Sequence, residues 1–248
     1  MRSISGREGG LGGVGRLGGL AIGLVLSLAS FCAAGQESVR TQEINECRSG
    51  ELLTWGDGQD RPAVGLPLTF VYDPAAAPAE FSPALVAGMV GKAVAAWSQC
   101  GVPSQLVSLA ERQPGSIRVQ WSAKESGGHF GLANLTRRTL SLGPPAFELL
   151  RQRNPAHDAR ETLQMVISHE MGHFFGLVAH SRRCVDVLSY YDDGKGGKCY
   201  SRDEAQRRLV TEYRHVLPTA CDIERCRKVN GLPSVPEEAA RRAGAVSR

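Results

Sequence analysis

The sequence predicts an α+β domain that follows an export signal. Short stretches with alternating β-branched and aromatic residues predict four strands, at residues 67–72, 116–121, 129–135 and 138–142. Three other stretches, with apolar residues at every third or fourth position, predict amphipathic helices between and after these strands. About 210 residues remain once the signal is removed, which is enough for one domain with a substantial core.

Residues 1–34 are predicted to be a signal peptide. Three arginines precede the apolar run Leu17–Phe31, and Cys32-Ala33-Ala34 provides small residues for cleavage. The run is too short for a comfortable membrane span. Cys32 also suggests a lipoprotein, but a phenylalanine fits poorly in front of a lipidated cysteine. We therefore expect a secreted or periplasmic protein that has no membrane span.

The net charge and the cysteines of the exported part bear on its partners and on its disulfides. Without the signal the net charge is about +2, compared with +4 for the whole chain, which is too small to favour nucleic acid as a partner. Six cysteines remain, and an even number in an exported chain predicts disulfides. Their positions favour Cys184 with Cys199 and Cys221 with Cys226, which leaves Cys47 with Cys100.

Capping residues indicate where the helices begin. Ser82-Pro83 places a capping serine before a proline at the first helical position, and Gly101 ends this helix. Asp158 with Glu161 resembles a capping box for the second helix. Ser201 with Glu204 repeats that pattern and predicts a last helix. The apolar stripes of the three helices are Val86, Met89, Val90, Val94 and Trp97; Leu163, Val166, Ile167 and Met171; and Leu209, Tyr213 and Val216.

The second helix carries the candidate site, a stretch that begins at His169 and reads H-E-M-G-H-F-F-G-L-V-A-H. Residues four apart share one face of a helix, so His169 and His173 can bind one metal ion. Glu170 lies at the flank of that face, where its carboxylate can reach a water molecule. Catalytic zinc needs a third protein ligand. Gly176 can end the helix and turn the chain, which makes His180 the candidate.

This stretch resembles the metzincin signature H-E-x-x-H-x-x-G-x-x-H/D, which matrixins, astacins and snapalysins share. One position departs from the signature, because Ala179 stands where the family has its third ligand and His180 follows one residue later. Snapalysins are similar in having a histidine just past their ligand position. The resemblance is strong over residues 160–200 and extends to the rest of the chain only by pattern.

A second part of the resemblance lies downstream, in the segment C-V-D-V-L-S-Y-Y that begins at Cys184. It is similar to the metzincin Met-turn, a tight turn below the metal. Leu188 replaces the methionine, a swap between side chains of similar volume. Tyr190 matches the tyrosine that astacins and serralysins place beside the zinc.

The resemblance implies both a fold and a function. The fold would be a twisted mixed sheet with an active-site helix and a backing helix, and a cleft between the sheet and a small C-terminal subdomain. It would span residues 36–230. The Pro, Glu, Ala and Arg residues beyond it predict a mobile tail at 231–248. The function would be a monomeric zinc endopeptidase for protein or peptide substrates, with Glu170 as general base and Tyr190 as oxyanion donor. Strand 139–142 would be the sheet edge that pairs with substrate.

Two other interpretations remain open from the sequence. In a different class of zinc enzyme, an acidic residue on a later helix, such as Asp203 or Glu204, would be the third ligand. Alternatively, the protein is a secreted binding module that keeps the fold and has lost turnover, and the departures at Ala179 and Leu188 are the residues on which this second interpretation rests.

Three further features have weaker signals. Residues 192–197 are a candidate calcium site, but they lack alternating oxygen ligands and are more typical of a flexible turn. His129 is expected to be an ordinary strand or surface histidine. Cys47 does not have the sequence context of a matrixin propeptide cysteine that plugs the zinc.

Overall fold

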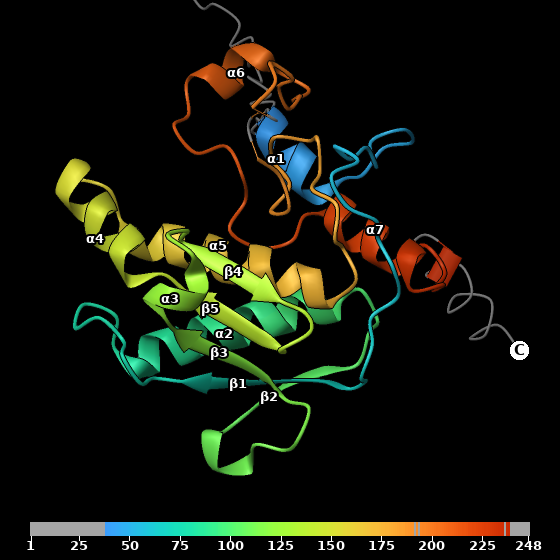
Figure 1. The fold of residues 1–248 in the computed structure, drawn as a ribbon. Helices are drawn as coiled ribbons and strands as arrows, with labels where there is room; N and C mark the ends of the chain where they lie inside the picture. The colour runs from blue at the N-terminus through green and yellow to red at the C-terminus, as the bar shows by residue number, and fades with distance from the viewer. Residues whose placement is uncertain (1–37, 191, 193, 236, 239–248) are drawn as a thin grey trace, which may run out of the picture. The chain divides into compact units, whose positions relative to one another are not determined.

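A computed structural model describes residues 38–238 except 191, 193 and 236. The predicted signal peptide at 1–34 and the end of the predicted tail lie outside this part of the chain. Within it the structure has the predicted mixed α+β architecture, with one five-stranded sheet and helices packed against it (Figure 1). None of the described helices is long and apolar enough to cross a membrane.

The sheet has the strand order β2-β1-β3-β5-β4. Four of its strands run parallel: β1 (Leu68–Asp73), β2 (Ser104–Val107), β3 (Ile117–Trp121) and β5 (Thr139–Leu142). The fifth, β4 (Gly131–Asn134), is antiparallel to β5 and forms one edge. β2 was not predicted from the sequence, because its four residues lack an alternating apolar pattern.

The prediction that residues 139–142 form the exposed edge is wrong. β5 pairs with β3 on one side and with β4 on the other, and all four of its residues are buried. A short turn before Thr139, in which Arg138 has a φ of 52°, folds β4 back along the outer side of β5. The edge on this side of the sheet is therefore β4.

Two long helices lie side by side on one face of the sheet (Figure 1). α2 (Pro83–Ser98) begins as predicted, because the Ser82 Oγ accepts a hydrogen bond from the Leu85 N–H and Pro83 occupies the first helical position. α5 (Ala159–Phe174) is capped by Asp158, whose carboxylate accepts from the Arg160 N–H.

The core between these helices and the sheet is largely aromatic where it approaches the candidate site. Trp97 on α2 is fully buried and stacks on Phe175, with ring centroids 5.5 Å apart. Its indole N–H donates to the Ser168 carbonyl at 2.9 Å, one residue before His169. Phe70 of β1 contacts both Phe174 and Phe175. The end of α5 that carries the histidines is thus fixed against α2 and the sheet.

The remaining helices are short, and the prediction of a last helix from Ser201 through Val216 is wrong. α6 spans only Glu204–Arg208 and is capped by Asp203. Tyr213 is buried beyond it, with its hydroxyl donating to the Glu43 carboxylate at 2.6 Å. The other short helices are α1 (Val39–Asn45), α3 (Ala123–Ser126), α4 (Pro144–Arg153), α7 (Ala220–Val229) and the 3-10 turn η1 (Leu109–Glu111).

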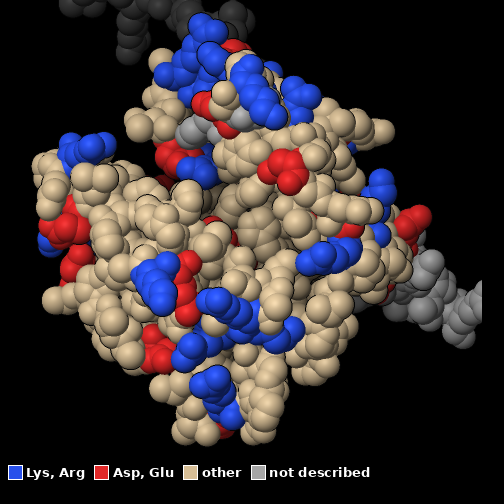
Figure 2. Space-filling model, viewed as in Figure 1, with Lys and Arg blue, Asp and Glu red and all other residues tan. Residues whose placement is uncertain are grey.

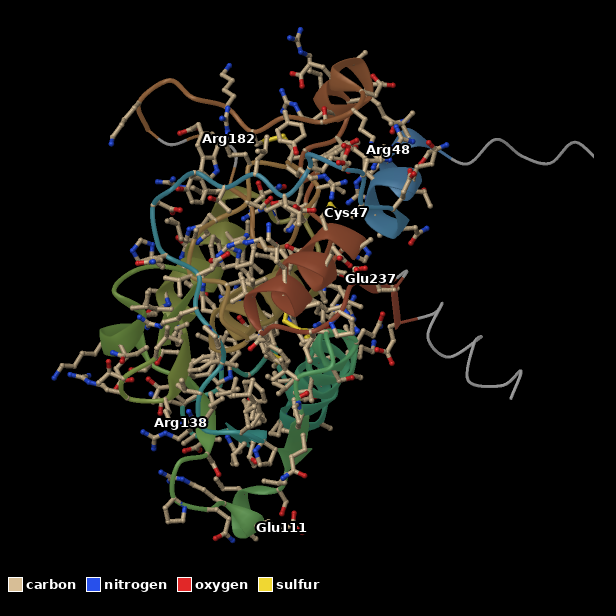
Figure 3. The ribbon with its side chains drawn as sticks, turned by 90° about the vertical axis from the view of Figure 1, so that its right-hand side faces the viewer. Cys47, Arg48, Glu111, Arg138, Arg182 and Glu237 are labelled. Atoms are coloured by element: carbon tan, nitrogen blue, oxygen red, sulfur yellow. A yellow bond between two sulfur atoms is a disulfide. The ribbon has the colours of Figure 1, made fainter. Side chains whose placement is uncertain are left out.

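Three disulfides are present, but two of the predicted pairings are wrong. Cys184 pairs with Cys199 as expected, whereas Cys221 pairs with Cys47 and Cys226 with Cys100. Cys221 and Cys226 lie five residues apart on α7, so the helix holds their side chains apart. Cys221 therefore pairs with Cys47, just after α1, and Cys226 with Cys100, just after α2. Cys47 lies between α1 and α7 (Figure 3). The N-terminal segment is therefore tied covalently to α7.

Candidate metal centre

α5 places His169, Glu170 and His173 at the end of the helix nearest the buried aromatic cluster. The Nδ1 atom of His169 donates to the Val187 carbonyl at 2.7 Å, and that of His173 donates to the Leu177 carbonyl at 2.7 Å. A carbonyl can only accept, so each Nδ1 carries a proton. In the neutral rings the Nε2 lone pairs are therefore available for a metal.

The turn after α5 brings His180 to the same place. Gly176 has a φ of +101°, and a side chain there would meet the Arg61 carbonyl oxygen at 2.2 Å, so only glycine fits. The Nε2 of His180 lies 3.1 Å from the Nε2 of His169, and its ring centroid lies 5.2 Å from that of His173. One ligand atom from each of the three histidines lies within 4.8 Å of the others.

His180 is held by a residue that the sequence motifs did not reveal. Asp57, more than a hundred positions earlier, accepts from the Nδ1 of His180 at 2.6 Å and from its backbone N–H at 2.9 Å. It stands in the segment W-G-D-G, which carries no recognisable metal-site spacing. Only the tertiary fold shows that this carboxylate faces the third histidine.

The electrostatics of the cluster suit a cation. Burial, and secondarily the neighbouring His173 and His180, hold the pKa of His169 well below its usual range. Burial, and then His180, lower the pKa of His173 to about 4. Near pH 7 the rings of His169 and His173 are therefore neutral, and their Nε2 lone pairs can bind a cation. The Nε2 atom of His180 lies 3.1 Å from that of His169, close enough for one ion to contact both.

The donor set also fits zinc by its chemistry. Three histidines, each with one ring nitrogen hydrogen-bonded to a protein oxygen, are a ligand set typical of catalytic zinc. Soft or hard ions that prefer thiolates or carboxylates are less well matched. The described residues offer one other geometric grouping, Cys47, Glu51 and Cys221, but its two cysteines form a disulfide and provide no thiolates.

Glu170 lies between this cluster and the edge of the sheet. Burial raises its pKa to about 7, although a hydrogen bond from the Ala133 N–H at 2.8 Å favours the ionised form. Its Oε2 is 4.0 Å from the Nε2 of His173. Gly131 of β4 approaches so closely that an added Cβ would lie 2.8 Å from the Glu170 Cγ. The glutamate is thus held by the edge strand, beside the three ligand atoms.

Tyr190 and Leu188 also lie at the cluster. The Tyr190 ring lies 4.7 Å from that of His180 and stacks on Trp55 at 5.5 Å, while its hydroxyl donates to Asp57 at 2.8 Å. Leu188 is fully buried below α5, where a Cβ on Gly172 would lie 2.6 Å from its Cδ2. Tyr190 reaches the site, but its hydroxyl bonds to the carboxylate that holds His180.

The structure does not bring the other sequence candidates to the cluster. Asp203 caps α6, and Glu204 is exposed and pairs with Arg207 at 2.5 Å. His129 is exposed on the chain before β4. In the candidate calcium segment, Asp192 accepts from the Gly194 N–H, which is a turn contact, and residue 193 lies outside the described residues.

The surface around the site is hollowed between the part that carries β4 and the part that carries α6 (Figure 2). A small pocket of about 40 Å³ borders His173 and is lined by Arg61, Leu135 and Arg138, among others. A larger cavity of about 1100 Å³ lies elsewhere, against α1 and α7, and contains none of the cluster residues. The histidine cluster is thus separate from that cavity.

Comparisons with known proteins add little. No family model matches the sequence, and no curated protein matches it. Among solved structures, the chain is similar to one titled "GM1 bound form of the ECX AB5 holotoxin", with 16% sequence identity and a TM-score of 0.38. That match covers 66% of this chain and 79% of the other.

Proposed function

We propose that this protein is an exported zinc-dependent endopeptidase of the metzincin type. His169, His173 and His180 would hold the zinc ion, and Glu170 would be the general base. The observation that carries this proposal is the convergence of one nitrogen atom from each of three histidines beside the buried carboxylate of Glu170. Three disulfides, which form in oxidising compartments, support the export.

Zinc at such a site would act as a Lewis acid that polarises a carbonyl group and lowers the pKa of water. Glu170 would accept the proton of the water molecule that attacks the peptide carbonyl, and would then deliver it to the leaving amine. A carboxyl group whose pKa is raised to about 7 suits both steps near neutral pH. Burial, which causes that rise, also limits the access of bulk water to Glu170.

Edge strand β4 would hold the substrate. The Gly143 N–H donates to the Phe130 carbonyl, so in the antiparallel ladder residues 132 and 134 also face β5. The backbone groups of Gly131 and Ala133 then point away from the sheet, and the Ala133 N–H meets Glu170. An extended peptide added to this edge would run past Glu170 and the histidine cluster.

Zinc content and peptide-library cleavage, measured on wild type, Glu170→Ala and His180→Ala, test the proposal. Wild type should hold about one zinc ion per chain and cleave peptides, as the three-ligand site requires. Glu170→Ala should keep the zinc and lose cleavage, whereas His180→Ala should lose both. Zinc without cleavage in wild type would instead indicate a binding module, and zinc retained by His180→Ala would point to another third ligand.

A further inference from the structure

A segment from the N-terminal part of the chain lies along the loop that carries the third histidine. We call residues 54–61 the strap. The Trp55 N–H donates to the His180 carbonyl at 3.0 Å, and the Arg61 N–H donates to the Gly176 carbonyl at 3.1 Å. Thr54 and Ser181 form an isolated antiparallel bridge. The strap therefore follows the loop from the end of α5 to the residue after His180.

Two aspartates of the strap hold two consecutive amides of that loop. The Ala179 N–H donates to Asp60 at 3.0 Å, and the His180 N–H donates to Asp57 at 2.9 Å. Asp60 is in turn fixed by a bidentate ion pair with Arg225 of α7, at 2.7 and 2.8 Å, and Arg225 also donates to the Ala179 carbonyl. These contacts set which side chain of the loop faces the cluster.

The close approach of the strap explains the register of the third ligand. Gly58 lies so near the loop that a Cβ would be 2.9 Å from both the carbonyl oxygen and the Cγ1 of Val178. With both amides held, the Ala179 side chain is buried and His180 faces His169. The ligand that comes one residue late in the sequence is thus placed by backbone contacts to a distant segment.

His180 differs from the other two histidines in the partner of its Nδ1. His169 and His173 donate to backbone carbonyls of the loops below α5, whereas His180 donates to a carboxylate. His180 is also more exposed than His173, with 23% of its side chain exposed compared with 14%. A ring at the open side of a site needs a stronger orienting bond, and a charged acceptor provides one.

We propose that Asp57 is a positioning residue for zinc binding. It holds His180 in the tautomer with the proton on Nδ1 and aims the Nε2 lone pair at the histidine cluster. The inference rests on the proposed zinc site, and it concerns the affinity of that site rather than the reaction. Carboxylate partners of ligating histidines typically contribute 10–100-fold to metal affinity.

Asp57→Asn is the sharpest perturbation, because it keeps the shape of the side chain. The amide oxygen can still accept from the His180 N–H, so the strap stays in place. Its NH₂ group then faces Nδ1 and, as a donor, favours the tautomer with the proton on Nε2, which cannot bind a metal. Asp73→Asn is the matched control: it makes the same charge change at a residue that bonds to its own turn, at the Ala75 N–H.

The zinc dissociation constant, measured by competition with a chelating dye, should rise about 10–100-fold in Asp57→Asn and stay unchanged in Asp73→Asn. The melting temperature of metal-free Asp57→Asn should match that of wild type, which a merely structural role would not allow. Equal zinc affinity in Asp57→Asn and wild type would overturn the inference while leaving the endopeptidase proposal standing. Wild type that binds zinc without cleaving peptides would instead overturn the endopeptidase proposal and leave the inference on Asp57 standing.

A second measurement does not depend on any variant folding. Long-range ¹H–¹⁵N correlation spectra of metal-free wild type report which nitrogen of His180 carries the proton. We expect Nδ1. A proton on Nε2 would show that Asp57 does not hold the ligating tautomer, and the inference would be wrong.

Discussion

Replacing glycine by alanine is expected to have opposite effects on stability at Gly131, where β4 contacts α5, and at Gly88 of α2. A Cβ added to Gly131 would lie 2.5 Å from the Val166 Cγ1 and 2.8 Å from the Glu170 Cγ. Val166 is buried and β-branched, so its side chain cannot rotate away cheaply. At Gly88, in the exposed middle of α2, an added Cβ has nothing within 4 Å.

Gly131→Ala should therefore destabilise the protein and Gly88→Ala should stabilise it. Overpacking a buried contact of this kind costs about 2 kcal/mol of unfolding free energy. Alanine in place of glycine inside a helix contributes roughly 0.5–1 kcal/mol. For a domain of this size, the melting temperature should fall by about 4–8 °C for Gly131→Ala and rise by about 1–4 °C for Gly88→Ala.

Thermal unfolding of chelator-treated protein, followed by circular dichroism, measures both shifts without a contribution from bound metal. In Gly131→Ala, the edge strand must also move away from α5, which lengthens the hydrogen bond from Ala133 to Glu170. If the site is a peptidase, kcat should fall in this variant while zinc content stays the same. Gly131→Ala with the melting temperature of wild type would refute the close approach of β4 to α5.

Two further predictions concern a pair of buried aspartates and a disulfide. Burial raises the pKa of both Asp186 and Asp222, so the folded protein keeps a proton that the unfolded chain loses near pH 4, and stability falls as the pH rises from about 4 to neutral. Asp222→Asn should therefore gain stability over wild type progressively across that range in urea titrations; a pH-independent difference would contradict this. Replacing Cys184 and Cys199 together by serine should cost about 3 kcal/mol for a 15-residue loop, measured in the same titrations, and no loss of stability would argue against that pairing.

The parts of the fold that could be predicted from the sequence are those set by local interactions. The start of α2 follows from a serine cap and a proline that act within one turn. The two histidines of α5 face one way because of helix geometry alone. The left-handed turn at Gly176 is likewise a property of one residue, and for that reason the sequence alone could indicate His180 as a candidate ligand.

The parts that could not be predicted depend on contacts between distant segments. The neighbour of β5 is decided by a hairpin that folds β4 to its outer side. The sequence predicts both segments as strands but does not indicate which of them is the edge. The disulfide partners of Cys221 and Cys226 depend on α7, whose apolar pattern is weak because much of its buried face is charged or cysteine. Asp57 reaches His180 from a strap that the Asp60–Arg225 ion pair holds against α7, and the disulfide at Cys47 ties the segment before the strap to α7.

The surroundings of Ala179 and Leu188, the two departures from the metzincin signature, weaken both as arguments for a binding module. Ala179 gave substance to a binding module without a complete metal site, but the strap turns the next residue, His180, toward the cluster. Leu188 replaces the methionine of the turn, yet it is fully buried against Gly172, between the two histidines of α5. Its volume is close to that of methionine, so the floor of the site is filled. Three histidines therefore meet despite the alanine, and a buried leucine fills the methionine position, so the choice between peptidase and binding module depends on Glu170 and its access to a substrate on β4.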